Sequence, residues 1–328
     1  MLKYLLHTKK RTKLSDGLGY PIPSNKEFLV LFMIEPTEEE ELKVSKDWKI
    51  DLKILRNYPK EPTSKTFSTE PLQLVFGDYY INGNNDIKYA RILLTVSKNA
   101  LIITIPSKIN YYVNFLDELQ LKMKNNPKEY DSIGTILYEF IDDHTQDNYD
   151  VLRITEEKIV KLEQKVLDFD NKEFVNINEI VELKRELLRM SRRFWSTAKI
   201  IFLLKKRLIG VELSEKTARL VDGVYETYQH QLDILSSQRE MISDALSIYA
   251  TSISNRLAKT SNDLNVIMKK LTSLTVIVMV PTLIASMYGM NFKYLPAATA
   301  DYGFLEITAL MVGLSLVFYY YFHKRDWI

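Results

Sequence analysis

The sequence has no cysteine and little excess charge. Without cysteine there is no disulfide, thiolate zinc site, iron–sulfur cluster or cysteine nucleophile. The 44 basic and 42 acidic residues leave a net charge of +2, which argues against a nucleic-acid partner, because binding of that kind neutralises phosphates. With 328 residues, 46% of them apolar, the chain is long enough to form several domains with buried cores.

Charge is almost missing from the last part of the chain. Residues 271–328 carry six charged side chains, whereas residues 1–270 carry eighty. Residues 271–290 contain no charge at all, and residues 304–322 contain only Glu306. A stretch of about 20 apolar residues is long enough to cross a membrane as a helix. Two such stretches joined by a short loop favour two membrane spans over two buried helices of a large soluble core.

The basic residues beside these two spans predict their orientation. Lys269 and Lys270 precede the first span, and Lys324 and Arg325 follow the second. The connecting loop at 291–303 has one basic and one acidic residue. Cytoplasmic flanks carry the excess of Lys and Arg. We therefore expect a cell-membrane protein with both termini in the cytoplasm and the loop outside.

The first 213 residues read as two cytoplasmic regions. Strand-like runs at 28–34, 90–96 and 100–105, with a helix at 36–48, predict an α/β domain over residues 1–128. The stretch 58–85 reads as loop with room for one strand at 72–76. Residues 129–213 read as helical with an interruption near 169–174.

From Ser214 to Met290 the sequence predicts one long helix, because Pro281 is its only proline. Residues 214–270 would form a stalk that continues into the first span, with a total length of about 110 Å. The fold class is thus an α+β multi-domain membrane protein. One apolar stripe along this helix predicts a packing face: Tyr228, Leu232, Leu235, Ile242, Leu246, Tyr249, Ile253, Leu264, Ile267, Leu271 and Leu274.

A second stripe on the same helix consists of small, polar or thioether side chains and continues through the span. Its members are Thr251, Ser254, Ala258, Ser261, Asn265, Met268, Thr272, Thr275, Met279, Thr282, Ser286 and Gly289. Such a stripe fits either tight packing between membrane helices or the wall of a water-filled pore. The pore requires an oligomer, because two spans cannot enclose a channel.

The residues at the outer end of the first span favour the pore. The stretch VPTLIASMYGMNFKYLP at 280–296 contains Tyr288, Gly289, Met290 and Asn291. It is followed by the second span and by a basic-aromatic end at 324–327. This arrangement resembles the CorA family of magnesium channels and transporters, in which a Gly-Met-Asn sequence ends the first of two C-terminal spans. The resemblance implies a funnel-shaped homopentamer whose first spans line the pore.

The resemblance also implies roles for individual residues. Gly289, Met290 and Asn291 correspond to the outer ion-selecting ring. Eight positions are expected to line or gate the pore: Asn265, Met268, Leu271, Thr272, Thr275, Met279, Thr282 and Ser286. Thr275 and Ser286 are included because they belong to the stripe, and the other six because they match family positions. The family's cytoplasmic regulatory sites use carboxylates between subunits, and here a stalk carboxylate position falls at Gly223. We expect Glu70, Asp222 and Glu226 to serve instead as regulatory metal ligands.

This sequence departs from the family in its outer loop. Lys293 and Ala297 stand where relatives often carry acidic residues, which leaves Asp301 as the loop's only acid. An oxygen-lined filter still suits Mg²⁺, which prefers octahedral oxygen ligands and loses its water shell reluctantly. Zinc would prefer His or Cys ligands, and neither occurs in the stripe within the span.

The sequence therefore predicts a magnesium channel that admits Mg²⁺, with Co²⁺ or Ni²⁺ as further cargo, and that intracellular Mg²⁺ regulates. It predicts no organic cofactor and no enzyme, since no nucleophile–base pair or metal-ligand cluster emerges. Two alternatives remain open: a zinc transporter on the same scaffold, and a non-conducting coiled-coil scaffold anchored in the membrane.

Overall fold

The computed structural model describes residues 1–8, 11–24, 27–52, 64–67, 70–83, 85–106, 109, 112–167, 176–291, 295–297 and 300–328. The chain divides into two compact units, Met1–Ser247 and Ile248–Ile328. One helix, α6 (Glu215–Tyr288), runs through both units and confirms the predicted long helix. The interruption predicted near 169–174 lies outside the described residues.

The first unit contains a seven-stranded sheet in the order β2-β1-β3-β7-β6-β5-β4. Only β3 and β7 pair in parallel, and the other neighbours are antiparallel. The strands are β1 (Leu2–Thr8), β2 (Thr12–Asp16), β3 (Glu27–Ile34), β4 (Lys65–Phe67), β5 (Leu72–Asn82), β6 (Asp86–Val96) and β7 (Ala100–Ile105). The strands predicted at 28–34, 90–96 and 100–105 are confirmed, whereas β5 extends well beyond the predicted 72–76.

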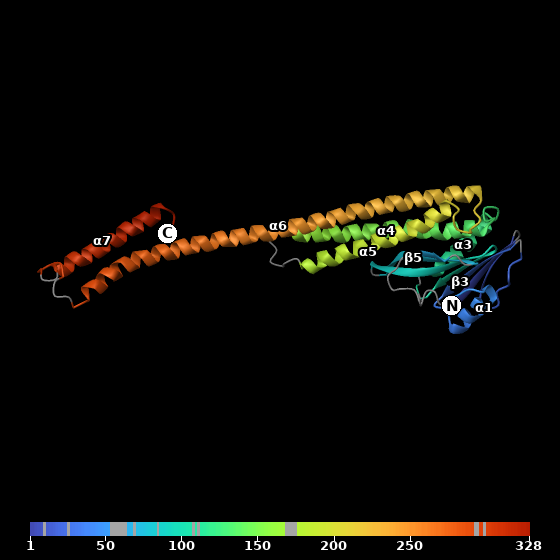
Figure 1. Cartoon of the computed structure of the whole chain (residues 1–328), viewed down its shortest axis with the longest axis horizontal. Helices are drawn as coiled ribbons and strands as arrows, with labels where there is room; N and C mark the ends of the chain where they lie inside the picture. The colour runs from blue at the N-terminus through green and yellow to red at the C-terminus, as the bar shows by residue number, and fades with distance from the viewer. Residues whose placement is uncertain are drawn as a thin grey trace. The chain divides into compact units, whose positions relative to one another are not determined.

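Helices cover both faces of this sheet (Figure 1). On one face lies α1 (Glu38–Trp48), whose Val44 is buried in a cluster with Leu31 and Ile102. A capping box formed by Thr37 and Glu40 fixes the start of α1. The other face packs against α3 (Val113–Asn125), α4 (Ile133–Leu167) and α5 (Ile177–Lys205).

Buried glutamines join α4 to the part of α6 that belongs to the first unit. Gln231 is fully buried, and its Nε2 atom donates a 2.7 Å hydrogen bond to the Thr145 carbonyl oxygen. Gln238, further along α6, donates in the same way to the Leu152 carbonyl oxygen at 2.9 Å. Because a buried amide must find its partners in the protein, these bonds fix the register between the two helices.

The second unit contains two helices that are long and apolar enough to cross a membrane, the C-terminal part of α6 and α7 (Gly303–Lys324). Within the span, between residues 271 and 288 of α6, the positions that are not exposed lie mostly on one face at helical spacing: Ser273, Val276, Ile277, Val280, Pro281, Ile284 and Tyr288. That face meets α7, because the Ser315 hydroxyl lies 3.4 Å from the Ile277 carbonyl oxygen and donates to it.

Candidate functional site

The polar stripe on α6 faces away from α7. All eight positions predicted to line or gate the pore are exposed in the single chain, with Met268, Leu271 and Met279 at 58%, 57% and 57%. In contrast, Ser273 on the face toward α7 is completely buried. The stripe therefore does not pack against the second span of its own chain. That excludes packing against α7 as the reason for its composition.

The threonines of this stripe share one hydrogen-bonding arrangement. The hydroxyl groups of Thr272, Thr275 and Thr282 each donate a 2.7 Å bond to the backbone carbonyl oxygen four residues earlier. Since each hydroxyl has one proton and two lone pairs, the exposed side of each oxygen is left as an acceptor. A hydrated cation presents the protons of its water shell, so a row of acceptors is the matching surface.

A shallow hollow of about 390 Å³ follows part of this stripe. Thr275, Met279 and Thr282 of the stripe form one side, and Leu274 and Val278 form the other. Oxygen atoms and bulky apolar side chains thus alternate along a single helix face. In a closed ring of such helices the apolar side chains would form constrictions between rings of oxygen atoms.

The Gly-Met-Asn residues lie where α6 ends. The amide groups of Gly289 and Met290 still donate to the carbonyl oxygens of Ala285 and Met287, at 3.0 and 3.3 Å, and Asn291 follows as an exposed residue. The C-terminal end of a helix carries the negative end of its macrodipole and its unpaired carbonyl groups. The amide oxygen of Asn291 is therefore beside a backbone that itself attracts cations.

The loop after Asn291 leads directly into α7. Lys293 lies outside the described residues. Asp301 is exposed. Gly303 is required at the start of α7, because a Cβ atom there would collide with the Ala297 carbonyl oxygen. Ala297 therefore lies against the first residue of α7, and Asp301 is the loop's only acidic residue.

Of the three residues proposed as regulatory ligands, two lie on α6 and one precedes β5. Glu70 is an exposed residue just before β5, and Glu226 is exposed on α6. Asp222 is half-buried on α6 and forms an ion pair with Lys205 of α5 at 3.4 Å. Asp222 would have to release this lysine, or share its carboxylate, to bind a metal ion.

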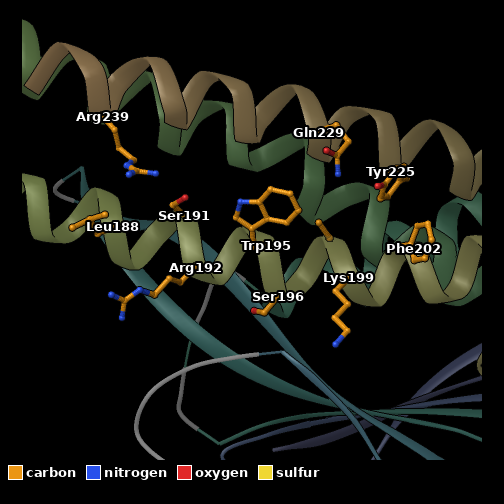
Figure 2. Close-up of a pocket in the computed structure, with 11 residues that line it drawn as sticks. Leu188, Ser191, Arg192, Trp195, Ser196, Lys199, Phe202, Tyr225, Gln229 and Arg239 are labelled. Atoms are coloured by element: carbon orange, nitrogen blue, oxygen red, sulfur yellow. The ribbon is translucent and has the colours of Figure 1, made fainter. Parts of the chain in front are cut away.

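A larger hollow of about 900 Å³ lies between α5 and α6 in the first unit (Figure 2). Trp195 projects into it from α5 and faces Tyr225 and Gln229 of α6. The charged residues among those that line this hollow are Arg192, Lys199 and Arg239, all of them cationic. A divalent cation would be repelled there, so this hollow is not a candidate for the regulatory metal site.

Comparison with known proteins agrees with this geometry. A family model described as "CorA-like Mg2+ transporter protein" matches residues 34–324. The chain is 29% identical to a cobalt/magnesium transport protein CorA of Methanocaldococcus jannaschii over 70% of each chain. It is 28% identical to a protein of the same name from Thermotoga maritima, over 59% of this chain and 52% of that one. The complete structure of the CorA magnesium transporter from Methanocaldococcus jannaschii superimposes with a TM-score of 0.73 at 21% identity, covering 100% and 99% of the two chains.

Proposed function

This chain belongs to the CorA-like Mg²⁺ transporter family, and from that membership we propose that it forms a channel through which Mg²⁺ enters the cytoplasm. Co²⁺ is a second candidate cargo, since the relatives from Methanocaldococcus jannaschii and Thermotoga maritima are named cobalt/magnesium transport proteins. Ni²⁺ is a third, because its coordination chemistry resembles that of Co²⁺.

One observation carries the proposal: a row of oxygen acceptors, interrupted by apolar side chains such as Met279, leads along α6 toward the Gly-Met-Asn end and faces away from its own partner helix. Thr272, Thr275 and Thr282 direct their protons back to the helix and their lone pairs outward. Neutral oxygen atoms hold a hydrated Mg²⁺ ion without trapping it as carboxylates would. We assign ion selection to Gly289, Met290 and Asn291.

Several copies of the chain are needed to close such a pathway, and we propose a homopentamer. Support comes from the apolar stripe of α6, which continues into Leu264, Ile267 and Leu274 at 56%, 59% and 58% exposure. Burial of these side chains by neighbouring copies would lower the free energy of the assembly.

The regions of the chain take the following places in this assembly. Residues 1–128 and 129–213 form the cytoplasmic part, and residues 214–270 form the stalk. Residues 271–290 line the pore, 291–303 form the outer loop, 304–322 face the lipid bilayer, and 323–328 form a cytoplasmic tail.

The membrane potential supplies the energy for this transport. A doubly charged ion moving through 100 mV toward a negative cytoplasm gains about 4.6 kcal/mol. No phosphate-binding glycine loop occurs in the sequence. A passive channel therefore suffices, and both termini are assigned to the cytoplasm on the basis of their basic flanks.

Regulation by the transported ion completes the proposal. Intracellular Mg²⁺ would bind carboxylates at the contacts between subunits, with Glu70, Asp222 and Glu226 as the candidate ligands. Bound ions would hold the stalks together and keep the constriction at Met268 and Leu271 closed. Loss of the ions would let the subunits separate and the pore open.

Purified protein in liposomes tests the transport proposal against its alternatives. We expect Mg²⁺ influx that is lost in Asn291→Ala and retained in Asn255→Ala, a matched control at an exposed position of α6 outside the stripe. Intact oligomers without flux under any Mg²⁺ gradient would favour the non-conducting scaffold. Zn²⁺ flux driven by protons, with no Mg²⁺ flux, would favour the zinc transporter.

A further inference from the structure

The hollow between α5 and α6 in Figure 2 repels cations, and the same charges make it suitable for an anion. Its volume of about 900 Å³ is in the range of small-molecule sites, which is roughly 300–1,000 Å³. Its walls come from α5 and from the part of α6 before Ser247, and both belong to the first unit. The hollow is therefore formed within one compact part of the chain.

An exposed tryptophan occupies the middle of this hollow. Trp195 is 59% exposed, and its indole points from α5 toward Tyr225 and Gln229 of α6 (Figure 2). Phe202 and Tyr225 lie at one end of the hollow, with their ring centroids 5.8 Å apart. An uncovered indole face next to other rings is a surface on which a flat ring can stack. The side-chain amide of Gln229 can both donate to and accept from the edge of such a ring.

Cations lie on both sides of Trp195. On α5, Arg192 is three residues before Trp195 and Lys199 four residues after it, so the three share one face of the helix. Arg239 extends from α6 toward α5 (Figure 2). Within the part of the chain that the structure describes, none of these three cations forms an ion pair and no carboxylate lines the hollow. Their charge is thus available to a ligand.

The positive region ends where a second, smaller hollow begins. That hollow of about 350 Å³ shares Leu188 and Arg239 with the first and also includes Lys184, Glu240 and Asp244. Its carboxylates would repel the negative groups of a ligand. An anionic ligand is therefore confined to the first hollow, between the aromatic end and Arg239.

We propose that this hollow binds a nucleoside triphosphate, whose base stacks on Trp195 and whose phosphates lie toward Arg192 and Arg239. This ligand class combines a flat ring with a chain of negative charges, as the hollow combines aromatic and cationic side chains. Guanidinium groups match phosphate oxygens in shape and charge. Stacking on an indole tolerates any base, so the choice among bases is left open. The proposal concerns binding alone and includes no chemical step.

Tryptophan fluorescence of the full chain in detergent tests the stacking. The sequence has three tryptophans, Trp48, Trp195 and Trp327. ATP is added in the presence of EDTA, because Mg²⁺ would neutralise part of the phosphate charge. We expect ATP to quench part of the fluorescence of the unaltered protein and of Trp327→Phe, the matched control. In Trp195→Phe this quenching should be lost, since the stacking ring is no longer a tryptophan. Quenching that persists in Trp195→Phe would overturn the assigned site.

Calorimetric titration under the same conditions tests the phosphate contacts. We expect Arg192→Gln and Arg239→Gln each to weaken ATP binding by about tenfold. Arg219→Gln should leave it unchanged, since Arg219 is an exposed residue of α6 outside the hollow. Inorganic triphosphate should bind about tenfold or more weakly than ATP, because it has no base to stack.

Two results of these titrations would overturn the proposal. One is equal affinity for ATP and inorganic triphosphate. The other is no binding at millimolar ATP, which is the result expected if a neighbouring copy of the chain covers the hollow. Failure of Mg²⁺ flux in liposomes would count against the channel and leave this result unaffected, since none of these residues belongs to the polar stripe.

Discussion

The hydroxyl group of Tyr288 donates a 3.0 Å hydrogen bond to the backbone carbonyl oxygen of Pro296. The bond joins the last residue of α6 to the far side of the outer loop, across the Gly-Met-Asn residues. Tyr288 does not belong to the polar stripe and is less exposed than the stripe residues. We therefore infer that it is a positioning residue, which holds the loop next to the Gly-Met-Asn residues through this bond.

Tyr288→Phe removes this hydrogen bond and keeps the ring. Because a neutral hydrogen bond contributes about 1 kcal/mol, we expect Mg²⁺ influx in liposomes to fall by about fivefold. Tyr302→Phe is the control, since Tyr302 is 72% exposed at the start of α7. Equal influx in both variants would show that the bond does not position the loop.

The threonine oxygens of the stripe can be tested one at a time. Thr282→Val keeps the shape of the side chain but removes its acceptor, so we expect Mg²⁺ influx to fall by about tenfold. The control is Thr308→Val on α7, where the hydroxyl donates the same kind of bond to the Phe304 carbonyl oxygen at 2.7 Å. Equal loss of influx in both variants would indicate a general effect on membrane helices rather than a pore contact.

Local patterns in the sequence predicted the features that depend on one element at a time. The spacing of apolar residues predicted α6, and the alternation of small polar side chains predicted the stripe, because both repeat along a single helix. The strand β1 was not predicted, since LKYLLHT mixes polar and apolar residues without strict alternation.

Features that join distant segments could not be predicted in this way. The parallel pairing of β3 with β7 connects residues about seventy positions apart, and neither strand specifies its neighbour. The sequence also did not show which face of α6 meets α7, because Val276, Ile277 and Val280 look like any apolar membrane residues. The packing of α4 on β5 likewise depends on how the helices and the sheet come together.

Arg193 of α5 holds this helix against the sheet. Its guanidinium carbon lies 3.7 Å from the centre of the Tyr89 ring and 5.4 Å from that of Tyr79, and Nη1 donates a 2.9 Å bond to the Tyr79 hydroxyl. Stacking and the hydrogen bond together should contribute about 2 kcal/mol.

We therefore expect Arg193→Ala to lower the melting temperature of the protein by several degrees. The melting temperature of Arg193→Lys should lie between those of the unaltered protein and Arg193→Ala, because lysine keeps the charge but loses the planar stack. Arg185→Ala on the same helix is the control, since Arg185 is exposed and pairs only with Glu182 in the described part of the chain. A melting temperature unchanged in Arg193→Ala would contradict the assigned role.

Regulation by intracellular Mg²⁺ predicts a linkage between the ion and stability. An ion that binds the folded, closed assembly raises its stability in proportion to the logarithm of its concentration once the sites fill. We expect millimolar Mg²⁺ to raise the melting temperature of the purified protein, and Asp222→Asn and Glu226→Gln together to reduce that rise. Asp233→Asn, another α6 carboxylate, is the control. Asp222 also pairs with Lys205 at 3.4 Å, so the double variant loses this ion pair as well. The melting temperatures of the double variant and the unaltered protein in EDTA, without Mg²⁺, measure the effect of that loss alone. Melting curves indifferent to Mg²⁺ would refute the gating proposal while leaving the pore assignment to the liposome assay.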